Sequence, residues 1–335
     1  MIERLHIVAL CLFLSLGVRG QLLTNLGGQR VGVSTLTFLK NDNSARSMAL
    51  GGANLTLSAD GMATSHNTAL LSQTNGIHIA VSDLIIGAGM HQGWLSASVP
   101  LKSSSSAVGV NLNYLSSGAM KVRTEFMPQG TGEYFYANQL SAGLAFSKML
   151  SDRFSFGANL KMIHERLAQF TNTTAAVDLG FLYTTDVKDL KFGIVVQNFG
   201  GNSILRDGNI SESYNRQNVS LDQFSVPTIF RLGASFKPIE LEDQSVMFAM
   251  QLEHPNDNSE NIRLGVEYEY MRTVFVRLGY KLNVAGENLP TLGIGYKTRL
   301  GRNTVNVNYA VNPTLYLGTL HLFGLDVMIN NDKRE

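Results

Sequence analysis

Cysteine is almost absent from this sequence, since Cys11 is the only one among 335 residues. It lies in an N-terminal stretch that we expect to be removed, which leaves the mature chain without a thiol. An exported chain of this kind has neither a disulfide framework nor a thiolate metal site. An excess of one charge is also lacking, because 27 Lys and Arg residues stand against 26 Asp and Glu residues. This balance provides no broad basic surface, so we expect no nucleic-acid partner.

Long apolar runs are missing after the N-terminus, where no stretch of about 18 apolar residues occurs, which excludes membrane-spanning helices. The N-terminal run "IVALCLFLSLGV" is itself too short to span a bilayer as a helix. It follows a short polar start and precedes the small residues Val18 and Gly20. This pattern predicts a signal peptide over residues 1–20, cleaved between Gly20 and Gln21, and therefore an exported protein.

Catalytic signatures are missing too. The sequence contains no G-x-S-x-G elbow, no H-E-x-x-H pair, no P-loop and no calcium loop of the EF-hand type. The pairs His164–Glu165 and Glu253–His254 join neighbouring residues, which point to opposite faces of a strand and cannot share a site. We therefore expect no enzymatic activity and no cofactor.

Strict alternation of apolar and polar residues dominates what is present. In residues 108–114, Val, Val, Leu and Tyr share one parity, while Gly, Asn and Asn share the other. Side chains on a strand alternate between two faces, so this pattern indicates β-structure and not helix. The same alternation recurs in residues 154–162, 263–270, 274–282 and 305–312. The sequence thus predicts an all-β protein.

About 14 such segments follow one another, the first over 76–84 and the last over 318–328. The links after even-numbered segments are short, whereas the two long links, 118–136 and 200–225, follow odd-numbered segments. Bacterial outer-membrane barrels have short periplasmic turns and longer extracellular loops. We therefore predict a transmembrane antiparallel outer-membrane β-barrel of about 14 strands over residues 76–329, in contact with outer-membrane lipid.

A soluble β-sandwich or propeller is the alternative explanation of the alternation. Its second face would have to fill a dry core with bulky apolar residues. Here that face carries Lys161, Asp178, Arg231, Glu253, Arg263, Glu267, Glu269, Arg277 and Lys281. Such charges need water or one another, as in a barrel lumen, so the membrane barrel is favoured.

One ion pair can be predicted from the register of two adjacent segments. If the turn after Tyr270 uses three residues, Tyr270 lies opposite Val274 and Glu267 opposite Arg277. A register offset by two would break this pair without exchanging the faces. We interpret the pair as a structural bridge in the lumen; a role in ion selectivity is the alternative.

The segment between the signal peptide and the first strand, residues 21–75, is rich in small residues and has no strand period. It contains Gly51-Gly52 and the turn signal Asp60-Gly61, which allow close backbone packing. A barrel of this size has a lumen wider than its side chains fill, and a plug often closes it. We predict that residues 21–75 form an N-terminal hatch.

Two stretches in this segment resemble a known family. "FLKNDNSARSMALGGAN" and "NTALL" resemble the N-terminal signature of the PorV/PorQ family, outer-membrane barrels of Bacteroidota with a FadL-like fold, 14 strands and an N-terminal hatch. The resemblance does not separate PorV-like from PorQ-like branches. The matching positions are Phe38, Leu39, Ala45, Arg46, Leu50, Gly51, Gly52, Ala53, Asn67, Ala69 and Leu71.

The resemblance implies a role in type IX secretion by contact with the translocon and with secreted cargo proteins. The long links would then bind partners through Tyr134, Phe135, Tyr136, Tyr214 and Phe224, unless these aromatic residues form an interfacial belt. The alternative function is FadL-like transport of hydrophobic small molecules. That function needs an apolar pocket, which the hatch leucines would line if they face a cavity and do not pack on the barrel wall.

Overall fold

The computed structural model describes residues 33–57, 60–101, 104–204, 206–207 and 223–330. The predicted signal peptide, its cleavage site, residues 21–32 of the predicted hatch and Tyr214 lie outside these ranges. In the described part of the chain, no helix is long and apolar enough to cross a bilayer.

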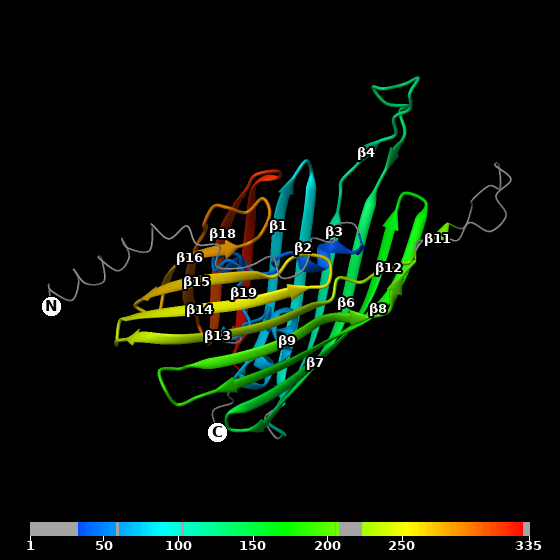
Figure 1. The fold of residues 1–335 in the computed structure, drawn as a ribbon. Coiled ribbons are helices and arrows are strands. Elements are labelled where there is room, and N and C mark those ends of the chain that lie inside the picture. The colour runs from blue at the N-terminus through cyan, green and yellow to red at the C-terminus, as the bar shows by residue number, and fades with distance from the viewer. Residues whose placement is uncertain (1–32, 58–59, 102–103, 205, 208–222, 331–335) are drawn as a thin grey trace.

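Fourteen long strands form the wall of the molecule over the described residues (Figure 1). They are β1 (Ile77–Gly87), β2 (Met90–Leu101), β3 (Ser106–Ser116), β6 (Ala137–Ser151), β7 (Phe154–Leu167), β8 (Phe170–Thr184), β9 (Lys191–Gly200), β13 (Ile229–Glu240), β14 (Gln244–Pro255), β15 (Asn261–Tyr270), β16 (Val274–Leu282), β17 (Thr291–Leu300), β18 (Asn303–Thr314) and β19 (Gly318–Ile329). Each pairs antiparallel with the next, and β1 pairs with β19, so the sheet closes into a barrel. The predicted fold class is confirmed.

The two faces of the wall carry the residues that the alternation predicts. On β3, Val110 is 50% exposed on the outside of the barrel, whereas Asn111 points inward and is 7% exposed. Outward apolar residues recur on other strands, for example Leu144 at 66% and Ile294 at 59%. An apolar outer surface that extends around a closed barrel requires lipid around it, because exposing so much apolar area to water would cost free energy.

Both long links contain short strands that the sequence pattern does not reveal. In the first, β4 (Met120–Lys121) pairs with β5 (Tyr134–Phe135) and forms an arm beyond the barrel (Figure 1). In the second, β10 (Asn202–Ser203) pairs with β12 (Phe224–Ser225), and β11 (Arg206–Asp207) extends the sheet next to β8. Two-residue strands are too short to show a period of two.

The N-terminal segment, by which we mean residues 33–57 and 60–75, lies inside the barrel (blue in Figure 1). It contains four short helical elements, η2 (Thr37–Lys40), α2 (Ala45–Ala49), α3 (Ala63–His66) and η3 (Thr68–Gln73). All four apolar clusters of the described residues join this segment to the wall. In one, Met48 packs with Trp94 and Leu322; in another, Phe38 packs with Ile163. The core thus lies between segment and wall.

Candidate functional site: a sealed waist and a vestibule

The N-terminal segment meets a ring of glycines on the inner wall of the barrel, and we call this level of the barrel the sealed waist. A Cβ added to any of these glycines would lie within 3.3 Å of an atom of that segment. At Gly279 it would lie 2.0 Å from the backbone nitrogen of Gly51, and at Gly157 it would lie 2.3 Å from that of Ala69. Real side chains cannot approach so closely, so glycine is required for this fit. The ring consists of Gly109, Gly157, Gly180, Gly193, Gly233, Gly265, Gly279 and Gly293.

The signature residues that the resemblance singles out lie at this contact, in three groups. Phe38 and Leu39 pack in the apolar cluster towards the long links. Ala45, Arg46, Leu50, Gly51, Gly52 and Ala53 face the wall around β14 to β19. Asn67, Ala69 and Leu71 face β3 and β6 to β8 on the other side.

Two of these groups hold the segment's own backbone in place. Gly51 and Gly52 both have positive φ, +66° and +85°, which only glycine adopts without strain, and they turn the chain after α2. The Asn67 side chain donates to the carbonyl oxygens of Leu55 (2.9 Å) and Phe181 (3.2 Å) and accepts a hydrogen bond from the Ala69 N–H. Asn67 therefore caps η3 and ties it to β8 at once.

The leucines of the segment pack on the wall. Leu50, Leu55, Leu57, Leu70 and Leu71 are each at most 2% exposed. Leu50 lies against Gly265, and Leu55 lies against Gly193 and Gly233. None of the five lines the large cavity at the short-turn end or the smaller one beside Thr171–Thr173. In this closed arrangement they offer no apolar pocket to a ligand.

Buried ion pairs join the segment to the wall. Glu267 lies opposite Arg277 in the predicted register, and their side chains are 2.6 Å apart. The structure adds a third member, because Arg46 also donates to Glu267, with nitrogen–oxygen distances of 2.7 and 2.8 Å. The sequence marked Arg46 only as a signature residue, since nothing local indicates which strand it reaches.

A second ionic contact was not foreseen from the sequence. Asp42 lies 3.3 Å from Lys281 and 3.9 Å from Arg263, both on the inner wall. Burial of the Asp42 carboxyl raises its pKa, but Lys281 and Arg263 outweigh this effect and hold the pKa at about 2. Asp42 is therefore ionised at physiological pH and adds an electrostatic tie to the sealed waist.

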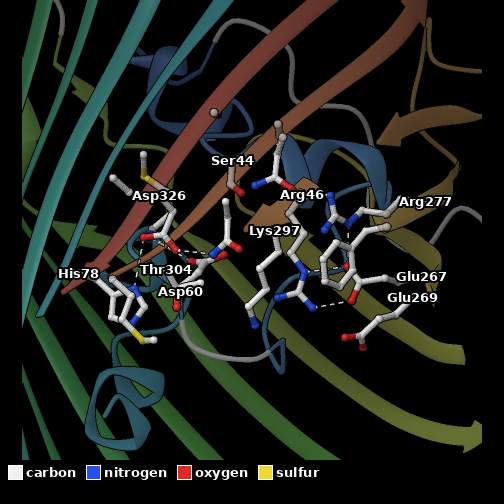
Figure 2. A pocket seen from close by; sticks show the side chains of 18 of the residues that line it. Ser44, Arg46, Asp60, His78, Glu267, Glu269, Arg277, Lys297, Thr304 and Asp326 are labelled. Atoms are coloured by element: carbon white, nitrogen blue, oxygen red, sulfur yellow. Dashed lines mark hydrogen bonds and ion pairs between the residues drawn. The ribbon is translucent and has the colours of Figure 1, made fainter. Parts of the chain in front are cut away.

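Below the waist, at the end with the short turns, the lumen opens into a vestibule of about 640 Å³. Charged side chains of both signs line it, including Arg46, Asp60, Glu269, Lys297 and Asp326 (Figure 2). Asp326 accepts hydrogen bonds from the Gly61 N–H (3.2 Å) and from Asn306 (3.1 Å), and lies 3.2 Å from His78. Burial and the nearby Asp326 carboxylate raise the pKa of Asp60 to about 6.

The aromatic residues predicted to bind partners lie at the opposite end. Tyr134 is 54% exposed and Tyr136 49% exposed, and Phe135 pairs with Met120 in the arm. The arm turns at Thr124–Met127, where Phe126 is 93% exposed. In the second link, Phe224 is half-buried in β12, which pairs with β10.

Comparison with known proteins shows which solved structures this fold resembles. No protein-family model matches the chain, and no curated protein matches its sequence. Among solved structures, a Pseudomonas aeruginosa FadL homologue is similar, at 11% identity over 87% of this chain and 98% of that chain, with a TM-score of 0.54. The toluene transporter TodX of Pseudomonas putida is similar at 13% identity over 88% and 98%, with a TM-score of 0.55. The Ralstonia pickettii toluene transporter TbuX is similar at 11% identity over 85% and 96%, with a TM-score of 0.53.

These identities are low, so the likeness concerns the fold and not the function. The three similar structures are a FadL homologue and two toluene transporters, and none of them is described as a PorV, PorQ or type IX secretion protein. Together with the apolar outer surface, the likeness supports a place in the outer membrane, with lipid around the wall. The chain has the fold of the FadL-like outer-membrane β-barrels.

Proposed function

We propose that this chain is a non-enzymatic outer-membrane barrel that acts by protein contact at its long-link end, with its lumen closed by the N-terminal segment as a hatch. The sealed waist carries this proposal. Eight wall glycines accommodate the segment's backbone, and the segment's leucines pack on the wall without facing a cavity. A lumen closed in this way leaves the outer surface as the part of the protein that can meet a partner.

The contact surface in this proposal is the arm formed by β4 and β5. Short turns mark the periplasmic end of outer-membrane barrels, so the arm lies outside the cell. Its tip, Phe126, lies several residues beyond the barrel strands, and exposed aromatic residues of this kind dominate protein–protein contacts. Tyr134, Phe135 and Tyr136 lie on the same arm; Phe224 and Tyr214 belong to the second link.

The resemblance to the PorV/PorQ family gives this contact a specific meaning. It implies that the partners are the type IX translocon and the proteins that it exports, which the barrel would bind and pass on. We adopt this role as part of the proposal, on the strength of the signature residues and of their place at the waist.

Transport of small hydrophobic molecules is the second candidate, and the similarity of fold favours it over type IX secretion. The similar structures include the two toluene transporters and, at 14% identity and a TM-score of 0.53, the CymD monoaromatic hydrocarbon channel. Under this function the N-terminal segment would have to move away from the glycine ring, because the leucines at the waist leave no pocket in the present arrangement.

The test is affinity purification from gently solubilised outer membranes, with mass spectrometry of proteins and lipids. The arm variant replaces residues 120–134 with a short Gly-Ser turn, and Tyr316→Ser in the β18–β19 turn, 82% exposed, is the matched control. We expect the translocon barrel or exported cargo with the unaltered chain and with the control, and neither with the arm variant. A preparation that contains fatty acid but no protein partner would overturn the proposal and support transport.

A further inference from the structure

The vestibule contains charged groups that the waist does not use. Most of its charged side chains are paired: Glu267 with Arg46 and Arg277, and Asp189 with Lys191 and Lys237. In these pairs each charge has a partner of the opposite sign, which offsets the cost of taking it out of water. Three further groups, Lys297, Glu269 and Asp60, lack such partners.

Lys297 is the unpaired cation. It lies on the inward face of β17, two residues beyond Gly295, and its side chain extends into the cavity (Figure 2). Within the described ranges, no carboxylate lies within ion-pair distance of its ammonium. An exposed strand lysine on the lipid side would anchor at the interface, but this one faces the lumen.

Two further carboxylates face the same cavity, and both lie in the electrostatic field of the Arg46 guanidinium without forming an ion pair with it in the described part of the chain. Glu269, on β15, accepts a hydrogen bond from the Ser245 hydroxyl at 2.9 Å. Asp60, in the N-terminal segment, accepts one from the Met62 N–H at 2.9 Å. No ion pair involves either carboxylate among the residues that the structure describes. Figure 2 shows Lys297, Asp60 and Glu269 around the same cavity, together with Arg46.

We propose that the vestibule is a binding site for small zwitterions that carry one ammonium and one carboxylate, as free amino acids and short peptides do. The ligand's carboxylate would accept hydrogen bonds from Lys297, and its ammonium would donate to Glu269 and Asp60. A volume of about 640 Å³ is ample for such a ligand and falls within the range of ligand-binding cavities. The opening at the short-turn end admits the ligand from the periplasm.

This site goes beyond the proposed function and does not depend on it, because no translocon, cargo or outer arm takes part in the binding. Measurement on the purified barrel therefore separates the two. A barrel that binds protein partners but no zwitterion would contradict only this inference. A barrel that binds zwitterions but no protein partner would contradict only the proposed function.

Isothermal titration of the detergent-purified barrel with tri-alanine tests the site. Alanine tests the smaller ligand, and N-acetyl-tri-alanine, tri-alanine amide and the doubly capped peptide remove one charge or both. We expect the free peptide to bind, each singly capped form to bind about tenfold more weakly, and the doubly capped form not to bind measurably. Equal affinity of the free and doubly capped peptides, or no binding of the free forms, would overturn the proposal.

Two variants assign the charges. Lys297→Gln is expected to weaken tri-alanine binding about tenfold while leaving the tri-alanine amide unaffected, because only the ligand carboxylate loses its partner. Glu269→Gln should show the opposite selectivity. Lys188→Gln, in the β8–β9 turn outside the cavity, is the matched control and should leave the affinity unchanged. If Lys297→Gln weakens all ligands equally, Lys297 does not bind the carboxylate and the assignment is wrong.

Discussion

The sealed waist and the vestibule share five strands, β9, β13, β15, β16 and β17, yet they differ in what fills the space between these strands. At the waist the wall presents glycines, and the backbone of the N-terminal segment lies directly against them. At the vestibule two of these strands present Lys297 (β17) and Glu269 (β15), β19 adds Asp326, and the space stays open. A wall of glycines lets a protein segment lie directly against it. A wall of charged side chains keeps a segment away, because burying a charge without a partner costs free energy. Where the N-terminal segment can pack therefore depends on which residue each strand places inward at that height in the barrel.

The strongest test of this contrast is Glu267→Gln at the boundary between the two regions. The change leaves the Arg46 and Arg277 guanidinium groups buried together without their shared carboxylate. We expect a loss of about 3–5 kcal/mol in the free energy of unfolding. Urea titration of the barrel in lipid vesicles measures it. Asp186→Asn, which removes an exposed pair with Arg153, is the control and should leave the free energy of unfolding nearly unchanged.

Gly279→Ala tests whether the waist needs its glycines. The added methyl carbon would lie 2.0 Å from the backbone nitrogen of Gly51, which no flexible side chain can relieve. We expect the added methyl to lower the free energy of unfolding by about 1–3 kcal/mol and to displace the N-terminal segment. The displacement would be visible as new ion conductance in planar bilayers. At Gly93 the nearest atom to an added Cβ is 3.8 Å away, so Gly93→Ala should change neither property. Equal behaviour of the two variants would contradict the close fit.

A smaller effect is expected where the segment meets the vestibule. Asp60 has its pKa raised from 3.8 to about 6, chiefly by burial and then by Asp326. The folded protein therefore binds more protons than the unfolded chain between these values, and its stability falls as the pH rises through about 6. Asp60→Asn should remove this dependence and stabilise the barrel by roughly 1–2 kcal/mol at pH 7.5. Thermal unfolding between pH 4 and 8 measures it, with the exposed turn residue Asp152, changed to Asn, as the control.

The smallest effect is expected at Lys297, an exposed residue of the vestibule. Lys297 forms no ion pair with a described residue, so Lys297→Gln should change the free energy of unfolding by less than about 0.5 kcal/mol. Urea titration beside the Glu267→Gln variant gives the comparison. A loss as large as that of Glu267→Gln would show that the vestibule charges hold the barrel together, and the distinction between the two regions would disappear.

Most of the wall could be predicted from the sequence because strand alternation is a local signal. The predicted segments and the observed strands differ mainly at their ends: β1 continues to Gly87, beyond the predicted limit at 84, and β13 begins at Ile229 instead of 226. The later start of β13 has a physical cause, because Pro227 has no N–H to donate to a neighbouring strand.

The site was predicted only in part. The register around Tyr270 placed Glu267 opposite Arg277, since a short turn fixes which residues face each other. Arg46, Asp42 and the glycine ring escaped prediction, because each depends on residues more than 40 positions away in the chain. Glycines that follow Leu or Phe in many strands were the available signal, and without the segment's path they read only as small inward residues.

The sequence by itself determined that this chain forms a closed barrel with an apolar outside and a polar inside, because the period of two acts residue by residue. Only the tertiary structure decided where that barrel is closed. The N-terminal segment has no period of its own, and its place depends on eight glycines from eight strands that come together only when the sheet closes. The vestibule exists for the same reason: the charges that line it become neighbours only around the completed barrel.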